Sequence, residues 1–209
     1  MAGRIGRTLG GIGLAALLAY GLFFAVQTLR PRALALELPS GLEAGDVVLM
    51  RSHTWRAELV RLIDGVPYRD GFSHVGLLHS RGADGVWTLV HAVPGADGTV
   101  RAERWPDIAR GGGISEAVVF RNTALDADAR ADLVVLQAEA AARAVPFDGG
   151  FDHHDASELY CTELVTYLHE QVGAPAVGPK VMARRAIFPG HLAASPALVP
   201  VGTTADAPR

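Results

Sequence analysis

The pattern of hydrophobic and polar residues changes twice along the chain. Residues 9–29 carry no charge and are largely apolar. From residue 45 onward, short apolar runs alternate with turns containing Gly and Asp, which is typical of strands. After residue 126, Leu, Val and Ala recur at helical spacing. The pattern therefore predicts an apolar N-terminal segment, then a strand-rich region, then a helix-rich region.

The apolar segment has the length of a transmembrane helix, since its 21 residues would span roughly 30 Å. Arginines flank it at positions 4, 7, 30 and 32. Ala33-Leu34-Ala35 has the small residues of a signal-peptidase site, so a cleaved signal sequence is the alternative. The run is longer than the apolar core of a signal peptide, and we therefore predict an uncleaved single-pass anchor at 9–29.

This anchor divides the chain into predicted segments. Residues 1–8 form a basic cytoplasmic start, 30–44 a linker, 45–201 one domain and 202–209 a flexible tail. We expect the N-terminus in the cytoplasm, which would put the domain on the extracytoplasmic side of the cell membrane.

Within the domain, the predicted strands share short apolar or alternating runs bounded by turn residues; they are residues 47–50, 72–79, 87–93 and 117–121. The second and third form a hairpin around Arg81–Gly85. Predicted helices cover residues 53–63, 126–145 and 157–172. The order of elements predicts an α+β domain with an antiparallel sheet packed on helices.

Charge and cysteine content exclude several classes of function. The net charge is −3 and Lys180 is the one lysine, so we expect no nucleic-acid partner. Cys161 is the one cysteine, which excludes an internal disulfide and a zinc site built from several cysteines. We expect no cofactor, and the sequence predicts no particular oligomeric state.

Two histidines are placed to interact across the predicted hairpin. Strand alternation puts His74 and His91 on apolar faces of their strands. A hairpin centred between Gly82 and Ala83 would set the two histidines directly opposite each other, with Cβ atoms about 5 Å apart. We therefore predict a hydrogen bond between the two imidazoles.

Cys161 lies on the apolar stripe of the last predicted helix, with Leu164, Val165 and Leu168. Asp155 with Glu158, or Ser157 alone, would cap this helix and put Cys161 near its first turn, where the helix dipole favours thiolate. Cys161 is then the candidate nucleophile, His74 the base and His91 the residue that orients His74.

Other interpretations of these residues stay open. A lone cysteine on an apolar stripe is more often a small buried hydrophobe than a nucleophile. His74, His91 and Cys161 also form a chemically sensible zinc ligand set. His153-His154-Asp155 is a second metal candidate, but adjacent histidines lack helical ligand spacing. We predict no metal site.

Several motifs together resemble one family, the permuted papain-like cysteine amidases of the NlpC type, in their YiiX/YebB-like branch. The motifs are Gly45-Asp46-Val47-Val48, Phe72-Ser73-His74-Val75-Gly76, Val90-His91-Ala92-Val93, Pro146-Phe147-Asp148 and Leu159-Tyr160-Cys161-Thr162-Glu163-Leu164-Val165. The resemblance implies a circularly permuted papain-like fold in which the base precedes the nucleophile. It implies Cys161 as nucleophile and His74 as base.

The resemblance also implies a function, with one departure. YiiX-like members usually have glutamate at the position of His91, and histidine there is similar to the lecithin retinol acyltransferase-like branch. We expect a thiol-dependent hydrolase of the bacterial cell envelope that cleaves an amide bond, for example in a cell-wall peptide. A lipid acyl hydrolase or acyltransferase and a catalytically silent ligand-binding module are the alternatives. Tyr160 and Ser73, the sequence neighbours of Cys161 and His74, are the candidates for substrate contacts.

Overall fold

The computed structural model describes residues 37–52, 71–95, 97–151, 156–184 and 186–204. All of them belong to one compact unit, Leu34–Arg209. The predicted anchor at 9–29, the predicted helix at 53–63 and the residues 153–155 lie outside the described part. Within that part, none of the helices combines the length and the apolar character needed to span a bilayer.

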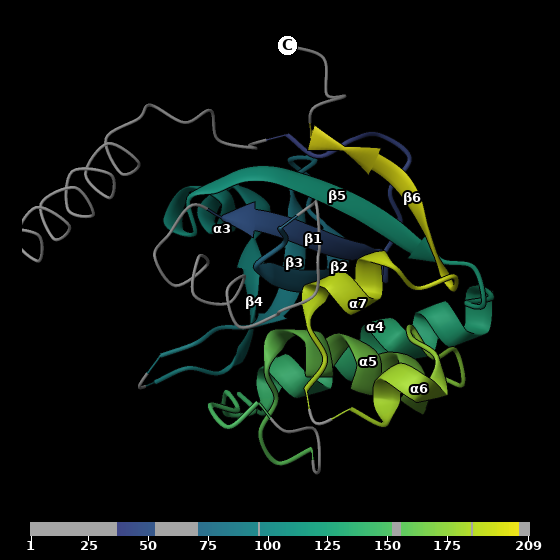
Figure 1. Ribbon diagram of the computed structural model, residues 1–209. Coiled ribbons are helices and arrows are strands. Elements are labelled where there is room, and N and C mark those ends of the chain that lie inside the picture. Colours follow the sequence, from purple (N-terminus) through teal and green to yellow (C-terminus); the bar gives the residue numbers. More distant parts are fainter. Residues whose placement is uncertain (1–36, 53–70, 96, 152–155, 185, 205–209) are drawn as a thin grey trace, which may run out of the picture. The chain divides into compact units, whose positions relative to one another are not determined.

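A six-stranded sheet forms the centre of this unit (Figure 1). The strands are β1 (Val47–Ser52), β2 (His74–Arg81), β3 (Trp87–Ala92), β4 (Val100–Arg104), β5 (Ile114–Asn122) and β6 (Leu198–Thr203). Their order in the sheet is β4-β3-β2-β1-β5-β6, and every neighbouring pair is antiparallel. The predicted α+β class is thus confirmed.

Helices pack on both faces of the sheet. They are α3 (Trp105–Gly111), α4 (Ala127–Ala142), α5 (Cys161–Gln171), α6 (Pro179–Met182) and α7 (Pro189–Ala193). The larger hydrophobic cluster joins one face of the sheet to α4, α5 and α7, whereas a smaller cluster joins the opposite face to α3. Side chains alternate between the two clusters along each central strand, as the pleat requires.

The four predicted strands are present, and the structure adds elements that the sequence did not reveal. β2 begins at His74, two residues later than predicted, and β6 includes Gly202 and Thr203 of the expected tail. β4 was not predicted because it is an edge strand on which only Val100 is buried, so its sequence lacks an apolar repeat. The seven-residue α3 is too short for a clear helical period.

The predicted register of the β2–β3 hairpin is wrong. Leu77 pairs with Val90 rather than with residue 88, so His91 lies opposite Gly76 and diagonal to His74. The tight turn runs from Gly82 to Val86 and includes Gly85 at φ 77°. A bulge after Leu78 also shifts the pairing, and an apolar repeat does not encode such a bulge.

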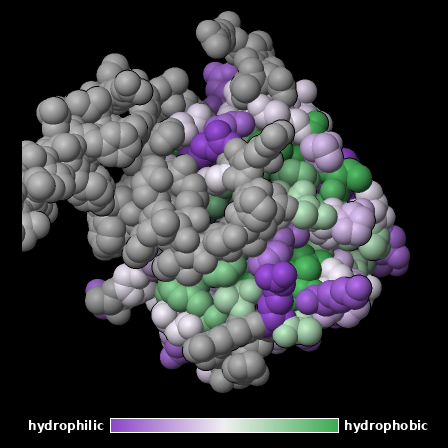
Figure 2. Space-filling view, viewed as in Figure 1, coloured by the Kyte–Doolittle hydropathy of each residue, from purple (hydrophilic) through white to green (hydrophobic). Residues whose placement is uncertain are grey.

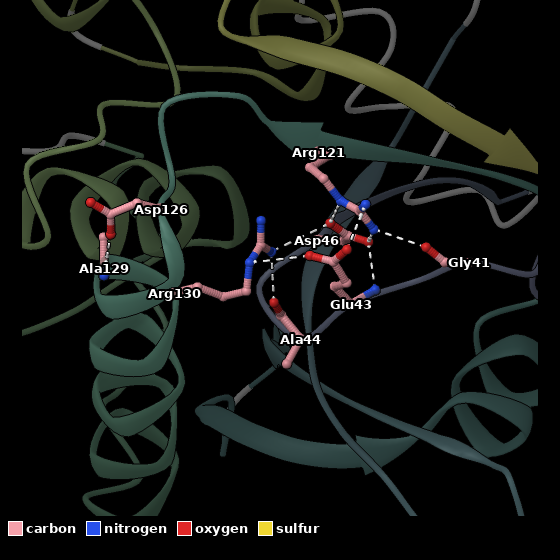
Figure 3. Close-up of polar contacts among 8 residues, drawn as sticks. All are labelled: Gly41, Glu43, Ala44, Asp46, Arg121, Asp126, Ala129 and Arg130. Atoms are coloured by element: carbon pink, nitrogen blue, oxygen red, sulfur yellow. Dashed lines mark hydrogen bonds and ion pairs between the residues drawn. The ribbon is translucent and has the colours of Figure 1, made fainter.

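A charged network ties the chain before β1 to β5 and α4 (Figure 3). Asp46 is fully buried, and both of its carboxylate oxygens bind the Arg121 guanidinium, at 2.8 and 2.7 Å. Arg130 of α4 lies 3.7 Å from the same carboxylate and donates to the Ala44 carbonyl. Glu43 pairs with both arginines. The network fixes the direction in which the chain enters the sheet.

The visible surface has a mixed character. On the face seen in Figure 2, hydrophobic residues are interspersed with hydrophilic ones. Val135 and Val199 are the large hydrophobic side chains that the described part exposes, at 55% and 42%. They belong to α4 and β6, so they do not form one patch around the predicted site.

Candidate active site

The predicted contact between the two histidines is present. Nε2 of His74 and Nδ1 of His91 are 2.8 Å apart, and the rings meet edge to face with centroids 5.1 Å apart. His91 is buried, at 4% exposure, whereas His74 is half-buried at the first residue of β2. The two imidazoles therefore form a hydrogen-bonded pair at the end of the hairpin.

A glutamate extends this pair. Oε2 of Glu103, on β4, is 2.9 Å from Nε2 of His91, and its Oε1 is 2.9 Å from Nε of Arg101. The hydrogen bond from His91 is the main reason that the pKa of Glu103 is lowered. Sequence analysis missed Glu103 because it missed β4. The alternation of Val100, Ala102 and Arg104 with Arg101 and Glu103 is the weak signal that was available.

Gly76 provides the room for His91. A Cβ atom at Gly76 would lie 3.1 Å from Cβ of His91 and 3.3 Å from the Val90 carbonyl oxygen. The first distance is shorter than an ordinary van der Waals contact. A residue with a side chain at this position would therefore push His91 away from His74.

Cys161 is the first residue of α5, which starts four residues later than predicted. The predicted caps Ser157 and Glu158 precede the helix by several residues, and Asp155 lies outside the described part. Instead, the Glu163 carboxylate accepts a hydrogen bond from the Tyr160 backbone N–H, at 3.3 Å. Glu163 is buried at this position.

The thiol of Cys161 lies where the sheet opens. The pairing of β2 with β3 ends at Leu77 and Val90, and the backbone N–H of Val75 forms a hydrogen bond to the sulfur. The Thr162 hydroxyl is 3.8 Å from the sulfur. Backbone hydrogen bonds from Cys161 and Thr162 also reach it. Backbone N–H groups of three residues thus lie near the sulfur, and such groups stabilise a thiolate or an oxyanion.

Strand alternation explains why the thiol of Cys161 contacts the backbone of β2 and not the imidazole of His74. Val75 belongs to the cluster that packs on α5, so alternation directs His74 to the opposite face, with Met50 across the strand pair. The sulfur therefore meets β2 at the backbone of the residue after His74. Among the hydrogen bonds of the described residues, none joins Sγ of Cys161 to His74.

Burial keeps both members of the predicted dyad uncharged. It raises the pKa of the Cys161 thiol, and the hydrogen bonds to the sulfur offset only part of this effect. The pKa of His74 is lowered to about 3, mainly by burial and secondly by the repulsion that two protonated imidazoles, His74 and His91, would exert on each other. The expected preference for thiolate at the helix N-terminus is therefore outweighed by desolvation, and the resting dyad is a thiol and a neutral imidazole.

The two predicted substrate-binding residues make internal contacts. Tyr160 is only 2% exposed, and its hydroxyl accepts a hydrogen bond from the Ile187 N–H at 2.8 Å. The Ser73 hydroxyl accepts one from the Ser52 N–H at 3.1 Å. Both side chains thus shape the ends of β2 and α5, and a direct contact of either with substrate stays a prediction.

The described residues do not fit a metal site. No group of three or more His, Cys, Asp or Glu side chains in that part of the chain is arranged to hold an ion. His74, His91 and Cys161 do not converge as the zinc alternative requires, because the imidazoles face each other and His91 also faces Glu103. The candidate at 153–155 lies outside the described residues.

Comparisons with known proteins agree with the architecture. The fold is similar to the crystal structure of the metalloprotein YiiX from Escherichia coli O157:H7, DUF1105, with a TM-score of 0.58 and 17% identity. The match covers 77% of this chain and 96% of the YiiX chain. No protein-family model and no curated protein matches the sequence. The chain therefore has a YiiX-like fold.

Proposed function

We propose that this protein is a thiol-dependent hydrolase of the permuted NlpC type. Cys161 is the nucleophile, His74 the general base and His91 the residue that orients His74. One observation carries the proposal: the chain's lone thiol lies at the first residue of a helix and meets β2 at the backbone of Val75, the residue after His74, whose imidazole is hydrogen-bonded to His91. The YiiX-like fold supports it.

The reaction starts from an uncharged dyad. A substrate carbonyl enters the opening, Cys161 turns toward His74, and the sulfur forms a bond to the carbonyl carbon while its proton moves to the imidazole. In apo enzymes, catalytic hydrogen bonds are often long or poorly aligned and tighten only when substrate is bound. The N–H groups of Val75, Cys161 and Thr162 then stabilise the negative charge that develops.

The second half of the reaction returns the proton. His74 gives it to the leaving amine, so that the C–N bond breaks and an acyl thioester remains on Cys161. Water then loses a proton to His74 and attacks the thioester, which releases the acid and restores the thiol.

The substrate we propose is an amide bond in a peptide of the cell envelope. The predicted anchor at 9–29 would hold the domain at the outer side of the cell membrane, where such peptides are found. A lipid acyl substrate is the second candidate, and His91 favours it. A histidine hydrogen-bonded to the base is similar to the lecithin retinol acyltransferase-like branch.

The test begins with the thiol. The chain contains one cysteine, so an iodoacetamide probe reports on Cys161 alone. We expect alkylation at neutral pH to fall by about tenfold or more in His74→Ala and to stay unchanged in His79→Ala, a matched histidine on the same strand. Equal rates in wild type and His74→Ala would contradict the proposal.

Product analysis then separates the substrates. Wild type and Cys161→Ala are incubated with purified cell wall and with phospholipid vesicles, in the presence and absence of a chelator. Thiol-dependent peptide release that resists the chelator supports the amidase, and fatty-acid release supports the lipid enzyme. Absence of both products, with a small molecule retained tightly, would identify a silent binding module and overturn the hydrolase.

A further inference from the structure

Glu103 lies at the outer end of a hydrogen-bonded series of side chains that leads to the proposed base. The series runs from Glu103 to His91 over 2.9 Å and from His91 to His74 over 2.8 Å. Arg101 holds the other carboxylate oxygen of Glu103 at 2.9 Å, which leaves Oε2 for His91. The carboxylate therefore has one defined partner on the histidine side.

The hydrogen-bonding chemistry of the three groups determines which atom is the donor in each bond of the series. An ionised carboxylate only accepts hydrogen bonds, so Nε2 of His91 must carry the proton that Glu103 receives. In a neutral His91, Nδ1 is then an acceptor, and Nε2 of His74 must be the donor to it. A neutral His74 that carries its proton on Nε2 has its lone pair on Nδ1.

We propose that Glu103 is a positioning residue that fixes the tautomers of His91 and His74, so that Nδ1 of His74 is the atom that accepts the thiol proton. This inference rests on the proposed function for its catalytic meaning. Glu103 itself touches neither the thiol nor the carbonyl under attack. After His74 takes the proton at Nδ1, its Nε2–H still donates to His91, so the series persists through the reaction.

A purely structural role for Glu103 makes a different prediction. An exposed ion pair with Arg101 would steady the edge strand β4 and leave the histidine protons where they are. The position of those protons is therefore the readout that separates the two roles.

The experiment uses the full chain with ¹⁵N-labelled histidine. Two-bond ¹H–¹⁵N correlation spectra at neutral pH distinguish imidazoles protonated on Nδ1 from those protonated on Nε2. For wild type we expect His74 and His91 both to be protonated on Nε2. For Glu103→Gln we expect the Nδ1-protonated form of both rings to appear, because the amide can donate a hydrogen bond to His91 as well as accept one.

Glu116→Gln is the matched control. Glu116 is a strand glutamate of nearly equal exposure, 34% against 31% for Glu103, and it is paired with Arg51 instead of a histidine. We expect its spectrum to match wild type. Alkylation of Cys161 should fall about tenfold in Glu103→Gln and stay unchanged in Glu116→Gln.

The outcomes separate this inference from the proposed function. Wild-type tautomers in Glu103→Gln, or an Nδ1-protonated His74 in wild type, would overturn the role of Glu103 even if Cys161 reacts in a His74-dependent way. Tautomers that change in Glu103→Gln while Cys161 is unreactive in wild type would support the positioning role and reject the hydrolase.

Discussion

At the scale of single residues, Gly76 and His74 link local geometry to the proposed chemistry. The motif around His74 identified the strand, and the predicted contact between the two histidines is present, although the register from which it was predicted is wrong and the two residues are diagonal neighbours. The sequence did not predict the opening in the sheet, because the end of a strand pairing depends on tertiary packing rather than on an apolar repeat. The hydrogen bond between Val75 and the sulfur was therefore visible only in the structure.

The importance of the space that Gly76 leaves for His91 can be tested directly. In Gly76→Ala the new Cβ would lie 3.1 Å from Cβ of His91, so we expect His91 to shift and its hydrogen bond to His74 to weaken. Overpacking of this kind should lower the unfolding free energy by about 1–3 kcal/mol, and Cys161 alkylation should slow. Urea denaturation and probe labelling measure the two effects.

Gly111→Ala is the control for Gly76→Ala, since no atom lies within 4 Å of a Cβ added at Gly111. It should leave both stability and alkylation close to wild type. Full reactivity of Gly76→Ala would show that the position of His91 does not matter for the thiol.

The uncharged dyad predicts an unusual pH dependence of thiol alkylation. Because the pKa of His74 is lowered to about 3, the imidazole stays unprotonated well below the ordinary histidine pKa of about 6.5 and can accept a proton throughout this range. We therefore expect a nearly flat alkylation rate in wild type between about pH 5 and 8. In His74→Ala only the thiolate reacts, so the rate should rise about tenfold per pH unit.

Alkylation rates of Cys161, measured by mass spectrometry between about pH 5 and 8, test this expectation. A step near pH 6.5 in wild type would mean that His74 titrates as an ordinary histidine, and a wild-type slope equal to that of His74→Ala would mean that it does not act as a base at all.

At the scale of elements, the main helices and central strands were predictable because each presents an apolar face at its own period. The ends of these helices and strands were less predictable. For example, α5 starts at Cys161 because the Glu163 side chain, from within the helix, caps its first turn. β4 was missed because an exposed edge strand has little apolar signal, and Glu103 was missed with it. Glu103, which is hydrogen-bonded to the histidine pair, could therefore not be predicted from the sequence pattern.

The entry of the chain into β1 depends on the buried carboxylate of Asp46. Asp46→Asn would leave the two nearby arginines without a full counter-charge at a fully buried site. Breaking a buried ion pair from one side costs about 3–5 kcal/mol. Because Arg121 and Arg130 keep some exposure, we expect a smaller loss than that range, roughly 2–3 kcal/mol.

Glu43→Gln is the matched control, because Glu43 contacts the same arginines but its side chain is 49% exposed. Its loss should be under about 1 kcal/mol. The two variants are compared by their urea denaturation midpoints. Equal losses of unfolding free energy would show that the stabilisation by the network does not depend on the burial of Asp46.

At the scale of the whole molecule, buried neutral histidines couple stability to pH. His169 is fully buried in α5, its Nδ1–H donates to the Val165 carbonyl at 2.8 Å, and its pKa is lowered to about 4, mainly by burial. The pKa of His74 and that of His191 are lowered as well. In the unfolded chain all of them would titrate near pH 6.5.

The direction in which stability changes with pH follows from the number of protons bound in the folded and unfolded states. Between about pH 6.5 and 4 the unfolded chain binds protons that folded His169 does not, so its stabilising contribution is complete above pH 6.5 and is lost as pH falls. At about 1.4 kcal/mol per pH unit, His169 alone can remove roughly 3 kcal/mol. His74 acts in the same direction and continues to about pH 3.

His169→Phe isolates this effect, since phenylalanine fills a similar volume and does not titrate. Nε2 of His169 has no hydrogen-bond partner among the described residues, so the substitution removes one hydrogen bond and one unpaired polar atom together. We expect stability near that of wild type at neutral pH and a higher urea midpoint than wild type near pH 4.5. His79→Gln, at a half-buried position of β2, provides the comparison curve for removal of another histidine. Parallel midpoint curves for wild type and His169→Phe would mean that the acid sensitivity arises elsewhere in the molecule.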